Sequence, residues 1–419
     1  MRLFVYARQS TDDKEGPIHA EHRLRPVQVV HRQPVGERQQ QRMRFSCALF
    51  PSLLWCCFLV LGPPGFAFGQ GASADGRRSF WIDPQRMRQL PTEGEAWIRL
   101  TTAADRPLGT PNISDQTDDT EIFVLAKALV YARTRVASYR EQVIDACLEA
   151  IGTESGGRAL AAGWNTGSYV IAADLVELWR DPASDDQFRE WLRSMLTGDL
   201  SGKTLQSCHE DRPNNWGTGC GFSRIAIAAY LGDEQEIQRT AQVFEGYLGN
   251  RSQYAGFRFG DDLTWQSEPG RPVGINPKGS RIDGFVVDGV LPDDQRRGGS
   301  FEWPPPKENY IYTALNGAIP QAVILHRLGF DVWNWEDKAL LRSVEWLHAV
   351  AQFPAIGDDR TSDDMWVPYV VNYFYNANFP TASPRSAGRT VDWTDWTHSG
   401  ALIPGDTLAP SAPTRVRVE

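Results

Sequence analysis

The sequence predicts an all-α fold, an (α/α) toroid or barrel of antiparallel helix pairs with long functional loops. Three observations support this. Apolar residues recur three and four positions apart over long stretches, strand-like alternation is scarce, and short turns separate successive helical segments. The chain has 419 residues, 41% of them hydrophobic and 23% charged, which is enough for one large domain with a sizeable core.

The helical segments follow one another between residues 117 and 353. The first, 117–152, opens with Thr and Asp caps and has an expected break near Ala137, and 75–115 before it is expected to be irregular. Further helices are expected at 159–181, 185–196, 223–232, 233–250, 307–329 and 334–353. Residues 251–303 are rich in Gly, Asp and Arg and contain no obvious long element. A loop of that length inside a domain is usually functional.

The first seventy residues have the organisation of an export signal. Residues 45–62 form a strongly apolar run that follows Arg42 and Arg44 and precedes small residues, in the order of a secretory signal peptide. Pro51 within the run and Pro63-Pro64 after it argue against a membrane span. We expect a secreted or periplasmic protein, with no membrane contact after signal removal, divided as follows: 1–42, a disordered leader or over-extended start; 43–69, the signal peptide; 75–400, the toroid domain; 401–419, a disordered tail.

The charge balance excludes one class of partner and constrains another. The net charge is −9, and because the first 69 residues hold nine basic and five acidic residues, the remainder carries −13. Such an acidic protein is not expected to bind nucleic acid. A polyanionic substrate would require positive charge concentrated in one cleft. We expect that cleft to gather Arg212, Arg296, Arg297 and Lys307, in a protein that acts as a monomer.

The cysteines outside the signal are Cys147, Cys208 and Cys220. In an exported protein a Cys208–Cys220 disulfide is the favoured pairing because a short loop separates them, and three free thiols are the alternative. No zinc-type Cys/His spacing and no EF-hand loop is present. We therefore expect no metal and no cofactor.

Two segments concentrate residues with catalytic chemistry. Residues 209–233 place His209, Arg212, Asn214 and Asn215 in a Gly-rich turn just before a helix. Residues 288–315 bring two arginines, a lysine and two tyrosines to the start of another helix: Arg296, Arg297, Lys307, Tyr310 and Tyr312. Because Tyr310 and Tyr312 are two positions apart on a helix, they face different directions, and at most one is expected to be catalytic.

These segments resemble those of helical alginate and glucuronan lyases, which have an α/α toroid. The shared features are an Asn-Asn motif at a helix start and a Glu, here Glu302, eight residues before a Tyr that begins Tyr310-Ile-Tyr-Thr-Ala314-Leu315. Residues 125–135 and 329–337 also fit. The resemblance covers roughly residues 80–400 and implies a polysaccharide lyase.

Two positions depart from that pattern. Where the best-studied alginate lyases of this shape have a catalytic His directly after the Asn pair, this chain has Trp216, and where they have an Arg seven residues before the Tyr, it has Trp303. The resemblance is therefore to a divergent member, in which His209, Arg212 or Arg297 would have to replace the missing groups.

The chemistry of β-elimination assigns roles to these residues. Amide or guanidinium groups must stabilise the charge that develops on the uronate carboxylate, which suits Asn215 and Arg212. In mannuronate and glucuronate chains the C5 proton and O4 lie on the same side, so Tyr310 can act as base and acid in turn, alone or with His209, with a nearby cation stabilising its phenolate. The remaining residues are expected to bind the acidic polysaccharide: Asn214, Trp216, Arg297, Lys307, Tyr312 and Trp303.

Two other function classes stay open at this point. An inverting glycoside hydrolase on a similar toroid would need two carboxylates, Glu302 with one of Asp261, Asp262 or Asp288. A non-catalytic protein that binds acidic glycans would use Trp216, Trp265 and Trp303 as stacking platforms.

Overall fold

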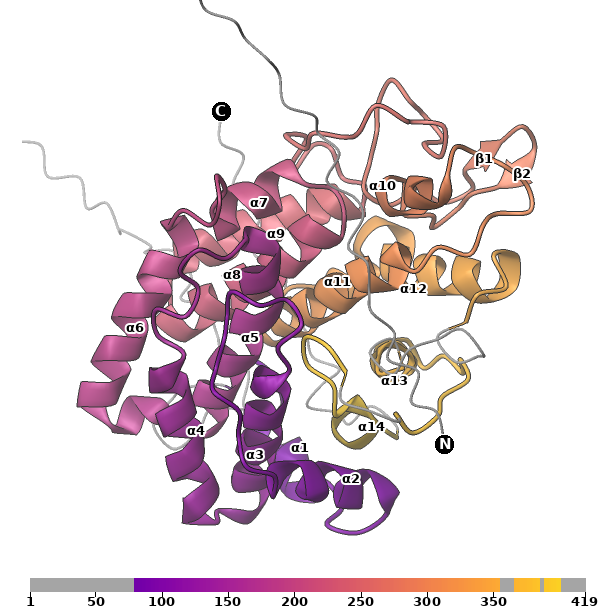
Figure 1. The fold of residues 1–419 in the computed structure, drawn as a ribbon. Coiled ribbons are helices and arrows are strands. Elements are labelled where there is room, and N and C mark those ends of the chain that lie inside the picture. The colour runs from indigo at the N-terminus through magenta and orange to yellow at the C-terminus, as the bar shows by residue number, and fades with distance from the viewer. Residues whose placement is uncertain (1–78, 355–364, 385–387, 401–419) are drawn as a thin grey trace, which may run out of the picture. The chain divides into compact units, whose positions relative to one another are not determined.

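The computed structural model describes residues 79–354, 365–384 and 388–400, all of which belong to one compact unit within Gly65–Glu419 (Figure 1). The α-helices of this part are α1 Pro84–Gln89, α2 Glu95–Ala104, α3 Thr120–Thr134, α4 Ala137–Glu149, α5 Ala159–Leu175, α6 Pro182–Thr197, α7 Leu205–Asp211, α8 Asn215–Leu231, α9 Glu234–Leu248, α10 Pro292–Gln295, α11 Tyr310–Arg327, α12 Trp335–Glu345, α13 Val367–Tyr375 and α14 Thr394–Thr397. Short 3₁₀ segments are η1 Leu178–Arg180, η2 Arg296–Gly298 and η3 Val332–Asn334, and η4 Trp346–Val350 is a π-helical turn. A two-stranded hairpin pairs β1 Arg281–Ile282 with β2 Phe285–Val286.

Local sequence signals explain where several of these helices begin and end. The Asp233 side chain accepts a hydrogen bond from the backbone of Glu236 at the start of α9. Thr204 and Ser207 form a reciprocal capping box at the start of α7. Gly232 ends α8 with a φ of 68°, a left-handed conformation in which glycine carries little steric cost. The break expected near Ala137 is confirmed, because Arg135 adopts a left-handed conformation between α3 and α4.

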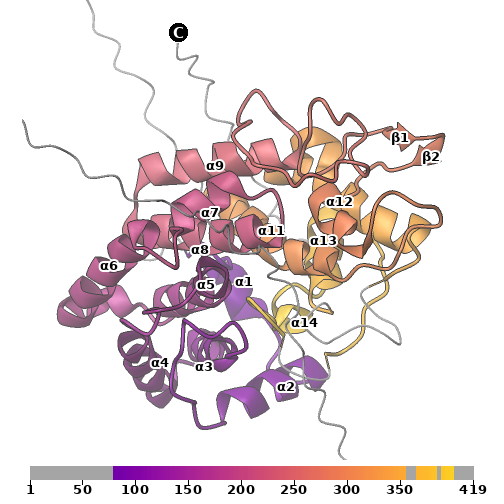
Figure 2. The same ribbon diagram turned by 45° about the horizontal axis from the view of Figure 1, so that its top comes forward.

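The helices close into a ring. Contacts run from α2 to α3, then through α5, α8, α11, α13 and α14 back to α2 (Figure 2). Arg99 of α2 helps close it by pairing with Asp392 and Asp395, at N–O distances of 3.0 and 2.6 Å. Outside this ring α4 packs on α3 and α5, α6 on α8, and α9 on α8 and α12. The predicted all-α toroid is confirmed.

Helices α5 and α8 run parallel at very short separation. The Ser223 hydroxyl of α8 donates to the Gly163 carbonyl of α5 and accepts from the Gly167 amide, each at 2.8 Å. A Cβ on Gly163 would lie 2.7 Å from the backbone nitrogen of Cys220, so only glycine allows this approach. Residues 163 and 167 of α5 therefore lie opposite residues 220 and 223 of α8, so residue numbers rise in the same direction along both helices.

Helices α8 and α11 repeat this arrangement. A Cβ on Gly317 would lie 2.4 Å from the Thr218 carbonyl carbon, and Gln321 Nε2 donates to Thr218 O at 2.9 Å. The Gln321 side chain also lies against Gly221, so residue numbers again rise together along both helices. The amino ends of α5, α8 and α11 consequently meet at one end of the ring, where helix dipoles favour negative ligands.

The structure corrects the expected course of the chain at two places. Residues 75–115 were expected to be irregular, but α1 and α2 lie there. The helix expected at 223–232 begins at Asn215, because the glycines read as a turn are helical and allow the close packing of α5, α8 and α11. The helix starting at residue 117 is confirmed apart from its boundaries, and 251–303 is a long loop that holds the hairpin, α10 and η2.

Some expectations are not addressed by this structure. The leader, the signal peptide and the 401–419 tail lie outside the described residues. Within the described ranges, no helix is both long enough and apolar enough to cross a membrane.

Candidate active site

The Asn pair begins α8 and joins it to the long loop. Asn214 caps the helix, since its Oδ1 accepts from the Trp216 backbone nitrogen at 3.1 Å. Its Nδ2 donates to Asp293 Oδ2 at 2.7 Å, and the Asn215 backbone nitrogen donates to Asp294 Oδ1 at 3.0 Å. The two segments that stand out in the sequence therefore meet at these four residues.

Asp293 and Asp294 are buried neighbours in different environments. Asp293 also accepts from Arg296 Nε at 2.7 Å and from the Gly260 nitrogen at 3.2 Å, so its charge is compensated. Burial, and then the adjacent Asp293, raise the pKa of Asp294 well above its usual range. Asp294 Oδ2 has no hydrogen-bond partner among the described residues, and the same is true of Asn215 Oδ1.

Tyr310 is the first residue of α11 and keeps 37% of its surface exposed. The Arg297 guanidinium lies over its ring, 4.2 Å from the centroid. Arg297 makes no ion pair with a carboxylate in the described ranges, unlike its neighbour Arg296. The predicted proton-transfer residue and one predicted cation are thus in contact at the amino end of α11.

Positive charge gathers around two tryptophans at the same end of the ring. The guanidinium carbons of Arg212 and Arg158 lie 5.6 and 5.7 Å from the centroid of the half-buried Trp216 ring, within cation–π range. Arg389 lies 5.1 Å from the centroid of Trp164.

A glutamine links two of these arginines. Arg158 donates to Gln116 Oε1 and Arg389 to the Gln116 carbonyl, each at 3.1 Å. Trp164 is 8% exposed, and its indole nitrogen has no hydrogen-bond partner among the described residues. Sequence analysis missed Arg158, Arg389, Trp164 and Gln116. One signal was present for Arg158, because it directly precedes α5 as Arg212 shortly precedes α8.

The structure argues against a catalytic role for His209. It is 2% exposed in α7, and its Nδ1 lies 3.4 Å from a nitrogen of the buried Arg224. Burial, with the positive charges of Arg224 and Arg239, lowers the pKa of His209 well below its usual value. The imidazole is therefore neutral and enclosed in an ion network with Glu210, so the catalytic assignment is corrected.

The structure contradicts the substrate-binding role predicted for Tyr312. Its side chain is fully buried, and its hydroxyl donates to the Phe353 carbonyl at 2.6 Å. Tyr312 therefore serves the core. The proposed disulfide is absent as well: Cys147, Cys208 and Cys220 are free and buried, which agrees with the alternative of three free thiols.

The four cations expected in one cleft have different contacts, and their convergence stays a prediction. Arg296 and Arg297 are joined to the Asn pair through α10 and η2, and Arg212 lies on Trp216. Lys307 instead is exposed beside Phe353, with Nζ 5.7 Å from that ring.

Trp303 lies with the hairpin. It stacks on Phe285 with centroids 4.6 Å apart and lines a hollow of about 540 Å³ with residues 349–352. No other residue predicted for the site lines that hollow.

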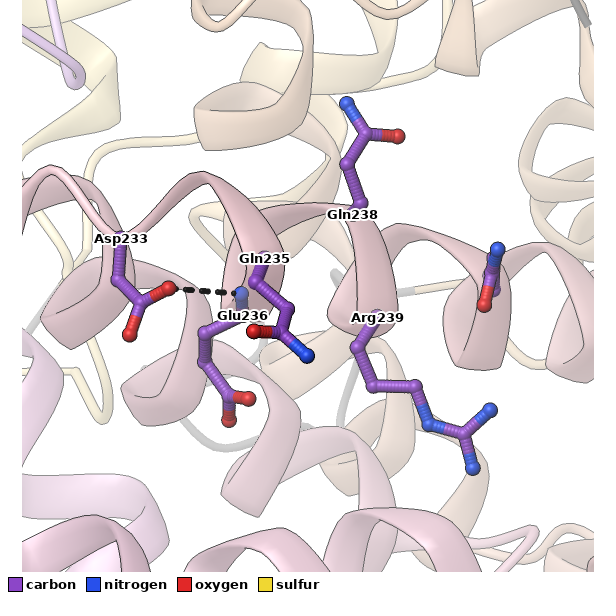
Figure 3. A pocket seen from close by; sticks show the side chains of 6 residues that line it. Asp233, Gln235, Glu236, Gln238 and Arg239 are labelled. Carbon is purple, nitrogen blue, oxygen red and sulfur yellow. Dashed lines mark hydrogen bonds between the residues drawn. The ribbon is translucent and has the colours of Figure 1, made fainter. Parts of the chain in front are cut away.

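A second hollow, of about 790 Å³, lies over the start of α9 and is lined by Asp233, Gln235, Glu236, Gln238, Arg239 and Gln242 (Figure 3). The positive charge of Arg239 in this hollow is already paired, because its Nε and Nη2 donate to the two oxygens of Glu210 at 2.9 and 2.8 Å. The remaining side chains are amides and carboxylates. This surface is therefore a poor candidate for binding a polyanion.

Three residues of the alternative functions, Asp262, Asp288 and Trp265, have structural roles in this fold. Asp288 pairs with the buried Arg342, and Asp262 accepts from Thr264 and Ser300, which hold its pKa below the usual value against the opposing effect of burial. Trp265 is fully buried and cannot be a stacking platform. In the described ranges, no three His, Cys, Asp or Glu side chains gather in a way that could hold a metal ion.

Comparison with family models and with curated protein sequences finds no match. Among solved structures, the crystal structure of alginate lyase A1-III from Sphingomonas species A1 is similar at 12% identity, over 77% of this chain and 95% of that one, with a TM-score of 0.45. A likeness at this level does not establish a family.

Proposed function

We propose that this protein is an exported polysaccharide lyase that cleaves 1,4-linked uronate polymers of the mannuronate or glucuronate type by β-elimination. The observation that carries this proposal is that the two candidate segments are joined at the amino ends of parallel helices in an otherwise acidic chain. The Asn215 N–H donates to Asp294, Arg297 lies over Tyr310, and Arg212 lies over Trp216. That arrangement concentrates positive potential where an acidic glycan would bind.

The elimination can be written with these groups. In its deprotonated form the oxygen of Tyr310, beside Arg297, takes the C5 proton, while the developing charge on the uronate carboxylate is stabilised by Asn215 and Arg212. The C4–O4 bond then breaks, a C4=C5 double bond forms, and Tyr310 returns the same proton to O4. Because Asn215 is only 1% exposed, we infer that flanking side chains move aside when the carboxylate binds.

The tryptophans and the remaining arginines are suited to bind the other sugar units of the glycan. Aromatic rings stack on sugar faces, and guanidinium groups bind carboxylates with two parallel hydrogen bonds. Trp216 with Arg158 and Arg212, and Trp164 with Arg389, supply both elements. The export proposed here rests on the order of the N-terminal sequence regions.

The test is an absorbance assay of the full chain and its secreted form against polymannuronate, polyguluronate and glucuronan, with reducing ends measured in parallel. A lyase gives near-ultraviolet absorbance together with new reducing ends on polymannuronate or glucuronan. Reducing ends without absorbance would establish a hydrolase, and binding without either signal would establish a glycan-binding protein. Activity on polyguluronate alone would contradict the same-side mechanism.

A further inference from the structure

The amino end of α8 is held by a carboxyl group rather than by solvent or substrate. The first backbone N–H of the helix, from Asn215, donates to Asp294 Oδ1, and Asp294 is 1% exposed. If this group were a carboxylate, it would place a full negative charge next to the residue expected to receive an anionic substrate. The protonation state of Asp294 therefore determines the charge beside Asn215.

The hydrogen bonds of the two carboxyl groups differ. Asp293 accepts from Asn214 Nδ2, from Arg296 Nε and from the Gly260 nitrogen. Asp294 accepts one backbone N–H, and its Oδ2 has no donor among the described residues. Burying a carboxylate with one oxygen lacking a donor costs more free energy than burying the neutral acid, so the proton of this pair belongs on Asp294.

Other charged and titratable groups surround the two carboxyl groups. Tyr247 of α9 lies near both of them, and burial raises the pKa of its phenol. The positive charges of Arg296 and Arg297 of η2 favour ionisation of Asp294, but burial and the neighbouring Asp293 outweigh them and raise its pKa. Tyr310 of α11 lies beyond Arg297, and Asp262 of the long loop lies near Arg296.

We propose that Asp294 is a positioning residue for the elimination: as a neutral carboxylic acid it accepts the first N–H of α8 and holds Asn215 in place without adding negative charge beside the substrate carboxylate. This inference rests on the proposed function. Asp293, tied to Asn214 and Arg296, is the charged partner that makes a second negative charge unfavourable.

The test compares the wild-type protein with Asp294→Ala, Asp294→Asn and the control Asp262→Asn. Asp294→Ala leaves the Asn215 N–H without an acceptor and should lower kcat about tenfold or more. Asparagine keeps a neutral oxygen acceptor, so Asp294→Asn should retain most of the wild-type kcat.

The pH dependence of KM tests the charge of Asp294. Wild-type KM should rise about tenfold at alkaline pH as Asp294 ionises, and this rise should be absent in Asp294→Asn but present in Asp262→Asn. Equal losses in Asn and Ala variants, or the same KM profile in wild type and Asp294→Asn, would overturn the proposal.

A second readout does not need activity. A carboxyl group with a raised folded-state pKa stabilises the fold below its unfolded pKa of about 3.9, and this contribution is lost as pH rises toward the folded value. The unfolding midpoint of wild type minus that of Asp294→Asn should therefore fall as pH rises above about 4. A difference that rises instead shows an ionised Asp294 and ends the proposal. If the wild-type protein has no lyase activity, the proposed function fails, and this series still decides the protonation state.

Discussion

The Arg297 guanidinium lies 4.2 Å from the centroid of the Tyr310 ring, at the amino end of α11. The contact joins the long loop to the helix that supplies the proposed base. Since Arg297 has no carboxylate partner among the described residues, its positive charge is available to the phenolate that the elimination requires. Arg296, one position earlier, pairs with Asp293 at 2.7 Å, so two adjacent arginines have different tasks.

Tyr310→Phe is expected to abolish most turnover while preserving the fold. The substitution keeps the ring on which Arg297 lies and removes only the hydroxyl that transfers the proton. Positioned acid–base groups contribute about 10²–10⁴-fold, so kcat on polymannuronate or glucuronan should fall by that factor. The measurement is the rate of near-ultraviolet absorbance at saturating substrate.

The matched control is Tyr312→Phe. It removes the hydrogen bond to the Phe353 carbonyl and should cost about 0.5–1.5 kcal/mol of stability with little change in kcat. Near-full activity of Tyr310→Phe would remove the phenol from the mechanism.

Asn215→Ala should lower kcat by about 10²–10³-fold, by analogy with the loss of one oxyanion donor. The side chain makes no hydrogen bond through Oδ1 to a described residue, so the fold should tolerate its removal. Asn214→Ala is the contrasting variant, because it loses the helix cap and the bond to Asp293 and should destabilise the protein by about 1 kcal/mol. If the two variants lose stability equally and Asn215→Ala remains active, Asn215 is structural.

Arg212→Gln should weaken substrate binding and also slow the chemical step, because Arg212 is proposed to stabilise the charge of the uronate carboxylate. Arg212 is exposed over Trp216, and a hydrogen bond to a charged group contributes about 1.5–3 kcal/mol, so KM should rise about tenfold or more. Added salt should raise wild-type KM through screening and should affect the variant less. Arg258→Gln, an exposed arginine paired with Asp211, is the control. A purely kcat effect in Arg212→Gln would contradict this role.

Short-range patterns predicted part of this site. Asn214 was recognisable as a cap because capping depends on neighbouring residues. The burial of Tyr312 is also consistent with helical periodicity, since Leu315, Asn316 and Ile319 are buried with it.

Long-range contacts could not be predicted in this way. The bond from Arg389 to Gln116 spans 273 residues, and no local pattern indicates it. The glycines after Asn215 were misread as a turn because their low helix propensity is overridden by tertiary packing.

Gly163→Ala is expected to affect both stability and catalysis, because Gly163 sets the separation of α5 from α8. Its added Cβ would lie 2.7 Å from the Cys220 nitrogen, a backbone atom that can yield only if α8 shifts. Overpacking of this kind costs about 1–3 kcal/mol, more than the roughly 1 kcal/mol that alanine gains in helix propensity. A shift of α8 also moves Asn215 relative to Tyr310, so kcat should fall in the variant molecules that remain folded. Gly270→Ala is the control, since a Cβ there meets no atom within 4 Å. Denaturant unfolding and absorbance kinetics on both variants measure the two effects, and unchanged kcat in a destabilised Gly163→Ala would show that the site tolerates movement of α8.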